Sequence, residues 1–410
     1  MKNTILIWLL LLITYTGLYS QFYNDGAEVL IESGCFIHIQ GDFINQGGLI
    51  TNEGRIELGG NWINTVMSNP LSQGTGVVTL FGNDQTIGGA FNTLFNDLQI
   101  LNSQNVTLGA TIGISDQINL GDGTLTLDRN ILHILSSSSN ALLSMEGGII
   151  AETTDDYGYV RWDIGEDGSG QYAIPFENNL GTNIPVSFNV TGIQGTGPDG
   201  YLLFTTFVTD EVNNPAPVGV TNVDINGDNS GLRLVDRFWE INTIDYTVAP
   251  SISTTLIFDE SNEIVNNNDI ETDKLEVINW EIPSQMWLTS PRESDSSPNS
   301  VTSELIENYG SLGLWSNTTT SVDDPETLVA INLWPNPTVN ELSLEVDYDK
   351  TETVQVFIFN ELGELLITRN EKILSGNNLL KIDVDVLDAG AYQLYLTGET
   401  LTSSSRFVKI

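Results

Sequence analysis

The chain has 410 residues and a formal net charge of −40, with 54 Asp and Glu against 14 Lys and Arg. Such an acidic protein repels phosphate groups and anionic lipid heads, which excludes nucleic acid and an anionic membrane surface as partners. A single cysteine, Cys35, excludes an intramolecular disulfide framework, and only two histidines, His38 and His133, are present for zinc or Ser-His chemistry. Composition therefore argues against an enzyme.

The first twenty residues are typical of a secretory signal peptide. Lys2 gives a positive start, residues 5–13 form an apolar stretch, and residues 18–20 precede Gln21 as a cleavage site. A membrane anchor is the alternative, because the uncharged run over residues 3–26 is long enough to span a bilayer. We expect a mature protein without a transmembrane segment, located outside the cytoplasm.

Residues 21–148 repeat themselves. Residues 37–45 align with residues 56–64 at an offset of 19, and residues 78–83 align with residues 56–61 at an offset of 22. Shorter echoes follow at 106–109, 118–121 and 125–128. Each unit is a short apolar-x-apolar strand followed by Gly or Asn, and stacked rungs produce such a period because one rung cannot bury its apolar face alone. The pattern predicts a right-handed parallel β-solenoid, with an ordinary antiparallel sandwich as the alternative.

Residues 149–316 have longer alternating segments separated by turns rich in Asn, Gly and Asp, which predicts an antiparallel β-sandwich. We expect its five tryptophans to supply core bulk, and the alternative is an exposed aromatic platform for a ligand; they are Trp162, Trp239, Trp280, Trp287 and Trp315. Residues 317–327 are polar and without periodicity, which is typical of a linker.

Residues 328–410 form a compact block of predicted strands in which apolar and polar residues alternate. Since the two preceding regions are also predicted to consist of strands, the fold class of the whole chain is all-β. The last block is predicted to be an Ig-like β-sandwich that folds independently. Four motifs stand in it in order: residues 333–337, 356–363, 387–392 and 405–410.

These motifs closely resemble the type A C-terminal sorting domain of the type IX secretion system, the Por secretion system C-terminal sorting domain family of Bacteroidetes. The matching residues include Pro335, Asn336, Pro337, Gly363, Gly390, Tyr392 and Lys409, while Arg406 stands where such domains often have Lys. The resemblance implies export to the periplasm and then passage through the outer membrane, with this domain as the sorting signal. It implies as partners the translocon and its sorting protease, cleavage in the linker, and surface lipopolysaccharide as an anchor unless the protein is released.

The upstream sequence is also similar to repeat-containing surface proteins of the same bacteria. Residues 171–176, 184–188 and 237–241 carry this weaker likeness, which implies no catalytic residues.

One segment has the residue types of a calcium loop. Asp224, Asn226 and Asp228 alternate, so their oxygens can turn towards one point, as at the start of an EF-hand loop. The twelfth position, however, is Val235 rather than the Glu that closes such loops. The alternative is an ordinary Asn/Asp-Gly turn, and apart from this calcium no cofactor is expected.

Other candidate chemistry is weak. Carboxylates at 155–156 and 163–167 flank Trp162, as a glycoside hydrolase pair would, but carboxylates are abundant throughout this chain. We expect structural or surface roles for both histidines. The sequence therefore predicts a secreted, non-catalytic protein of the outer cell surface with a structural or adhesive role. The alternative function is extracellular carbohydrate binding, with a glycan or another cell-surface ligand as partner.

Overall fold

The computed structural model describes residues 20–410 except 68–70, 73, 102–104, 154–155, 167, 191–196, 226–227, 230, 266–267, 283, 291–298, 304–305, 307–308, 318–326, 329–330, 361–364 and 399–400. The predicted signal peptide, apart from Ser20, and most of the predicted linker lie outside these residues. Among the helices that are described, none is both long and apolar enough to cross a membrane. The chain divides into two compact units, Met1–Thr318 and Thr319–Ile410.

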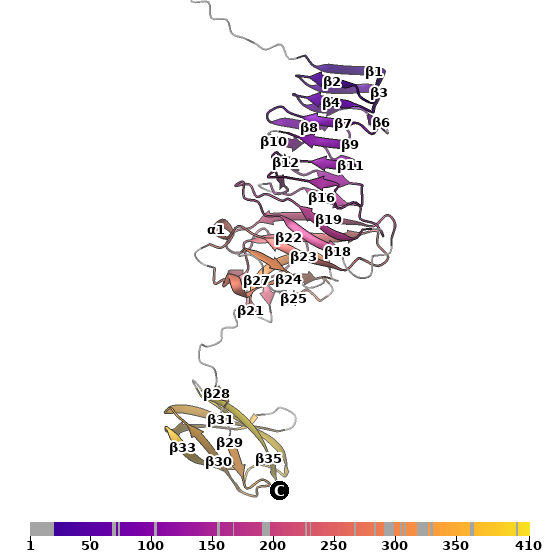
Figure 1. Cartoon of the computed structure of the whole chain (residues 1–410). Coiled ribbons are helices and arrows are strands. Elements are labelled where there is room, and N and C mark those ends of the chain that lie inside the picture. Colours follow the sequence, from indigo (N-terminus) through magenta and orange to yellow (C-terminus); the bar gives the residue numbers. More distant parts are fainter. Residues whose placement is uncertain are drawn as a thin grey trace, which may run out of the picture. The chain divides into compact units, whose positions relative to one another are not determined.

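Unit 1 begins as a β-solenoid of about six turns, which confirms the predicted repeat architecture (Figure 1). Its rungs build two parallel sheets. The first contains β1 (Phe22–Ile31), β3 (Phe43–Asn52), β5 (Trp62–Asn64), β8 (Gln85–Gly89), β10 (Asn105–Leu108), β12 (Thr124–Thr126) and β15 (Ile149–Ile150), with β6 (Leu71–Ser72) beside β3. The second contains β2 (Phe36–Ile39), β4 (Arg55–Leu58), β7 (Val77–Leu80), β9 (Thr93–Ile100), β11 (Ile112–Asn119), β13 (Ile131–Ile134) and β16 (Tyr159–Trp162), with β14 (Leu142–Leu143) beside β11.

The register of the rungs follows the offsets seen in the sequence. Ile37 lies beside Ile56, at the offset of 19, and Ile56 lies beside Val78, at the offset of 22. The later echoes do not fall in one sheet: those at 106–109 and 125–128 belong to the first sheet, and that at 118–121 belongs to the second. Both sheets face the same interior, so both need the same apolar-x-apolar pattern.

Side chains of the same kind stack in layers inside the first rungs. The rings of Phe22 and Phe43 lie 4.9 Å apart, and those of Phe43 and Trp62 lie 4.0 Å apart and nearly parallel. A second layer is polar, where Asn24 Nδ2 donates to Asn45 Oδ1 at 2.9 Å. These layers fix the register, because a slip by one residue would put every buried side chain on the outside.

At β16 the second sheet changes from parallel to antiparallel. It continues through β19 (Tyr201–Val208), β22 (Arg237–Ile244), β27 (Gly310–Ser316), β24 (Leu275–Glu281) and β25 (Met286–Ser290). A further antiparallel sheet contains β17 (Gly170–Ile174), β18 (Val186–Val190), β23 (Ile252–Ile257) and β26 (Ser300–Thr302). Short elements connect them: β20 (Asp224–Ile225), β21 (Asp228–Asn229), α1 (Glu260–Glu263) and two single 3₁₀ turns, Gly231–Arg233 and Thr272–Lys274.

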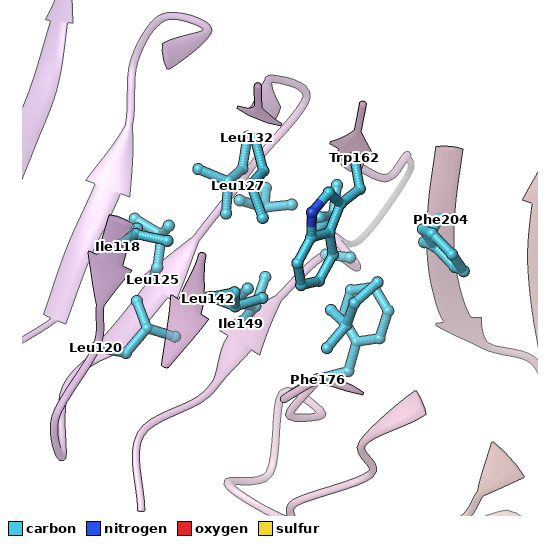
Figure 2. Packing of buried hydrophobic residues seen from close by; sticks show 14 of the residues in the cluster. Ile118, Leu120, Leu125, Leu127, Leu132, Leu142, Ile149, Trp162, Phe176 and Phe204 are labelled. Atoms are coloured by element: carbon cyan, nitrogen blue, oxygen red, sulfur yellow. The ribbon is translucent and has the colours of Figure 1, made fainter. Parts of the chain in front are cut away.

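The solenoid core runs on into the antiparallel part without a break. Figure 2 shows the leucines and isoleucines of the last rungs meeting Trp162, Phe176 and Phe204, and all belong to one buried cluster. The predicted boundary at 148/149 therefore falls inside one compact unit. All five tryptophans of residues 149–316 are at most 4% exposed, which confirms their core role.

Unit 2 is a separate antiparallel β module. One sheet contains β28 (Thr327–Leu328), β35 (Leu401–Lys409), β34 (Gly390–Thr397), β31 (Glu352–Asn360) and β32 (Leu365–Ile373), and only the β28–β35 pair is parallel. The other contains β29 (Ile331–Trp334), β30 (Glu341–Tyr348) and β33 (Gly376–Asp383). Its own core includes Leu342, Val356, Leu394 and Phe407.

Candidate functional site

The first and last motifs of unit 2 meet in space. Asn336 Oδ1 accepts a hydrogen bond from Val408 N at 2.9 Å, and Asn336 Nδ2 donates to Arg406 O at 3.0 Å. Just beyond, Thr338 N donates to Val408 O at 2.8 Å, and Ile410 N donates to Thr338 O at 3.0 Å. The segment that opens the module is thus fastened along its final strand, β35.

Two of the remaining motif residues make contacts at the end of the same strand. Tyr392 lies in β34, its hydroxyl donates to Asp388 O at 2.8 Å, and its ring stacks on that of Phe407 at 5.5 Å. Lys409 is 9% exposed, and its Nζ donates to Ile410 O at 3.1 Å. Gly390 begins β34, the bonds that precede Pro335 and Pro337 are both cis, and Gly363 lies outside the described residues.

A polar cleft of about 340 Å³ lies in unit 1 where the solenoid passes into the antiparallel sheets. Its lining includes Arg161, Asp163, Glu166, Asp199 and Ser137. Asp163 Oδ2 lies 2.7 Å from His133 Nε2, and Asp163 Oδ1 accepts from Arg161 Nε at 2.7 Å.

The electrostatics of this cleft favour an ionised carboxylate. Burial raises the pKa of Asp163, but the hydrogen bonds from His133 and Arg161 outweigh burial, so the pKa lies below its usual value. The Arg161 guanidinium also stacks over the Tyr201 ring, 3.6 Å from its centroid. A general acid needs a raised pKa, so Asp163 is not suited to donate a proton.

Among the described residues, two other sequence candidates are paired with neighbouring side chains. Asp156 pairs with Arg129 at 3.3 Å, while Asp155 and Asp167 lie outside the described residues. His38 is half-exposed and its Nδ1 lies 2.9 Å from Glu57 Oε2, which fits the expected surface role. Cys35 is exposed.

The calcium candidates are only partly described. Asp224 and Ile225 of β20 pair with Asp228 and Asn229 of β21 in an antiparallel hairpin, and Asp224 is exposed. Asn226 lies outside the described residues. Within the described part of the chain, no group of three or more His, Cys, Asp or Glu side chains is arranged to hold a metal ion.

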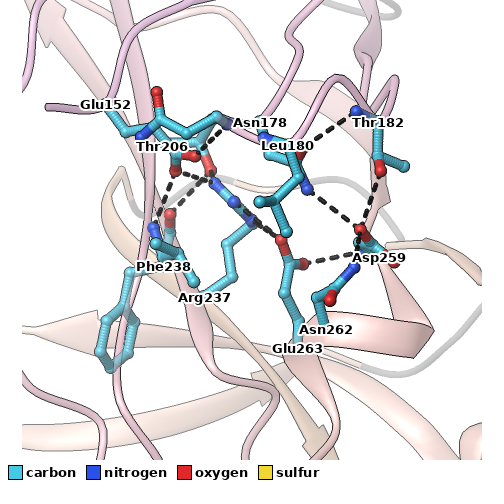
Figure 3. A network of polar contacts seen from close by, with 12 residues as sticks. Glu152, Asn178, Leu180, Thr182, Thr206, Arg237, Phe238, Asp259, Asn262 and Glu263 are labelled. Carbon is cyan, nitrogen blue, oxygen red and sulfur yellow. Dashed lines mark hydrogen bonds and ion pairs between the residues drawn. The ribbon is translucent and has the colours of Figure 1, made fainter.

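A fully buried arginine and its carboxylate partners form a network that sequence reasoning missed (Figure 3). Arg237 is fully buried; its guanidinium lies 3.0 Å from Glu152 Oε2 and 2.7 Å from Glu263 Oε1, and it donates to Thr206 Oγ1 at 3.0 Å. The two carboxylates also accept backbone hydrogen bonds, Glu152 from Asn179 N and Val208 N and Glu263 from Asp259 N. The network joins the end of the solenoid to β19, β22 and α1.

One sequence feature does mark this network. Arg237 stands directly before the apolar pair Phe238-Trp239 in a chain with only 14 basic residues. A cation in a buried strand requires carboxylate partners, because an unpaired buried charge is prohibitively costly.

Comparison with known proteins identifies the C-terminal module. Residues 332–410 match the family described as the secretion system C-terminal sorting domain, which confirms the predicted type IX sorting domain. No curated protein matches the chain. Among solved structures, the crystal structure of dimeric latent PorU from Porphyromonas gingivalis matches at 10% identity and a TM-score of 0.18, covering 58% of this chain and 25% of that one. A TM-score this low supports no conclusion about shared fold or function.

Proposed function

We propose that this chain, a cargo of the type IX secretion system that ends in its sorting domain, acts outside the cell as a non-catalytic structural or adhesive protein. The sorting domain implies export, to the cell surface or the medium. The structural or adhesive role is supported by one observation above others: the solenoid and the antiparallel sheets share a single continuous core.

A shared core suits a load-bearing spacer. Relative motion of two packed modules is expected where their interface is small, and here the second parallel sheet simply continues as the antiparallel one. The outer face of the rungs offers polar side chains for many weak contacts, among them the exposed Asn105 and Thr107 of β10. The lowered pKa of the Asp163 carboxyl also does not suit the general-acid role that a glycoside hydrolase pair would need.

Cell adhesion tests the proposal. Cells lacking the chain should adhere less, and the wild-type chain should restore adhesion. The double variant Asn105→Lys/Thr107→Lys replaces two neutral polar side chains on the outer face of β10 with positive charges and leaves the core unchanged. It should therefore not restore adhesion. Val218→Lys/Val248→Lys, at two exposed sites of the antiparallel part, is the matched control and should restore adhesion. If the double variant adheres as well as the control, the rungs are not the adhesive surface.

Processing is tested on the same cells. We expect mass spectrometry of the termini to find a start at Gln21 and an end within residues 317–327, and the fraction that holds the protein distinguishes a lipopolysaccharide tether from release. A chain with Ile410 still present and retained in the periplasm would contradict a sorted surface protein.

Carbohydrate binding is the second candidate, and the polar cleft favours it. Arg161, Asp163 and Ser137 present the kind of polar groups that orient sugar hydroxyls, and Tyr201 lies beside them. A tryptophan platform does not contribute, because the tryptophans of residues 149–316 are buried. Calorimetric titration with soluble polysaccharides should give heat that Asp163→Asn abolishes; no heat with the wild type would discard this candidate.

A further inference from the structure

A buried carboxylate beside the Arg237 network lacks a partner. Asp236 is 1% exposed, and among the described residues its Oδ2 has no hydrogen-bond donor. Its Oδ1 receives only two long hydrogen bonds, from Asn268 Nδ2 at 3.2 Å and from Asn213 Nδ2 at 3.5 Å. Buried carboxylates in proteins are paired or bind a metal, so this position calls for a compensating charge.

The neighbouring cation does not supply that charge. The Arg237 guanidinium is committed to Glu152 and Glu263, two carboxylates for one positive charge. Burial, together with the negative charges of Asp210, Glu211 and Glu263, raises the pKa of Asp236 to about 6 against the lowering effect of the hydrogen bond from Asn268. The surroundings of Asp236 are therefore electronegative as well as buried.

Three residues that contact Asp236 carry further buried oxygens without a hydrogen-bond partner in the described part of the chain. Besides Asp236 Oδ2, these oxygens are Asn213 Oδ1, Asn268 Oδ1 and Thr209 Oγ1. Asn213 and Asn268 touch the Asp236 carboxylate with their side chains, and Thr209 lies directly opposite Asp236 across the strand pair, with Thr209 N donating to Asp236 O at 2.9 Å. A set of carboxylate, amide and hydroxyl oxygens without nitrogen or sulfur selects a hard cation.

The spacing is compatible with one shared ion. The oxygen and nitrogen of an Asn amide exchange places by a half-turn of the side-chain amide. After that turn, the amide oxygens of Asn268 and Asn213 would lie 3.2 and 3.5 Å from Asp236 Oδ1, and Asn268 would exchange its 3.4 Å hydrogen bond to Leu234 O for the bond to the ion. Ligand oxygens that each lie about 2.3–2.6 Å from one Ca²⁺ are separated by distances of this order.

We propose that Asp236, the amide oxygens of Asn213 and Asn268, and the hydroxyl of Thr209 bind a calcium ion. The ion would fasten the loop at 209–214 and Asn268 to the start of β22. This site is separate from the segment at 224–228 and does not depend on the adhesive role. With one carboxylate, we expect a Kd of about 10⁻⁴–10⁻³ M, the range of extracellular calcium modules.

Thermal unfolding of the purified full chain tests the site. After chelation, calcium up to 10 mM should raise the wild-type Tm saturably by about 2–4 °C. Asp236→Asn should abolish the rise, and without calcium its Tm should not fall below that of the wild type, since an amide needs no counter-charge. Asp224→Asn, which removes a carboxylate from the other calcium candidate, should keep the full rise.

A gain-of-affinity variant guards against a folding defect in Asp236→Asn. Asn268→Asp adds a second carboxylate, so it should lower the Tm without calcium and shift the calcium midpoint about tenfold lower. The site is overturned if the wild-type Tm does not respond to calcium, if Asp236→Asn retains the rise, or if Asn268→Asp leaves the midpoint unchanged. Loss of the rise in Asp224→Asn alone would overturn it in favour of the 224–228 segment.

Discussion

Asn336 and Val408, 72 residues apart in the chain, are joined by a hydrogen bond of 2.9 Å from the Val408 backbone to the Asn336 side chain. The same side chain donates to Arg406 O at 3.0 Å, so one amide spans two backbone positions of β35. These hydrogen bonds form only when the Asn336 side chain and the backbone of β35 are both in place. The opening motif and the last six residues of the sorting domain therefore form one structural element.

Replacing Asn336 with Ala should loosen the end of β35. Each lost hydrogen bond is worth about 1 kcal/mol, and both are solvent-exposed, so we expect about 1–2 kcal/mol of local stability to be lost. Hydrogen exchange at the Val408 amide should accelerate about tenfold, while amides of β31 remain protected. Asn332→Ala, which removes only a 3.4 Å exposed contact with Glu345, is the control and should leave Val408 unchanged. Equal exchange in both variants would show that Asn336 does not hold the strand.

Arg237→Met should strongly destabilise unit 1. The variant keeps an unbranched apolar stem but leaves the Glu152 and Glu263 carboxylates buried without a counter-charge, which costs about 3–5 kcal/mol. Urea unfolding measures the loss. Lys274→Met, which removes an exposed pair with Asp273 at 3.7 Å, should change the unfolding free energy by less than about 0.5 kcal/mol.

A compensated variant separates charge from packing at Arg237. Adding Glu152→Gln and Glu263→Gln to Arg237→Met removes the uncompensated charges, so part of the lost stability should return. No recovery would mean that the Arg237 side chain acts through its packing instead.

The raised pKa of Asp236, about 6, gives a testable pH dependence in the absence of calcium. The folded protein holds this proton more tightly than the unfolded chain, whose Asp pKa is 3.8. The stability that Asp236 contributes is therefore present at low pH and is lost as pH rises from about 4 to about 6. Subtracting the unfolding free energy of Asp236→Asn isolates it from other carboxylates. The difference should decline by about 2 kcal/mol across that window, and a flat difference would contradict the raised pKa.

Contacts that recur from rung to rung could be predicted from the sequence, whereas contacts that occur only once in the fold could not. The pairing of Ile37 with Ile56 and of Ile56 with Val78 was predictable, because stacked rungs put like residues beside each other. The partners of Arg237 were not, since nothing local distinguishes Glu152 and Glu263 from the other acidic residues of the chain. The motifs around Asn336 and Val408 were visible, but their mutual hydrogen bond required the folded module. The continuous core at 148/149 was hidden because the repeat pattern fades there while the second sheet goes on.

The aromatic layer of the solenoid gives a prediction about how stability is distributed in unit 1. Trp62 is fully buried between Phe43 and Phe95, and its indole nitrogen donates to Thr93 Oγ1 at 3.1 Å. Trp62→Ala would leave a large cavity in the early rungs, at a cost of about 3–5 kcal/mol. Because each rung contacts chiefly its neighbours, the loss should be local.

Hydrogen exchange can locate that loss along the chain. In Trp62→Ala, amides of β1 to β5 should exchange much faster, while those of β19 and β22 should keep wild-type protection. Phe36→Ala is the matched control: it also removes a ring from the first rungs, but Phe36 is 68% exposed, so protection should stay unchanged. Uniform deprotection of the whole unit by Trp62→Ala would show instead that the solenoid and the antiparallel sheets unfold as one cooperative block, in keeping with their shared core.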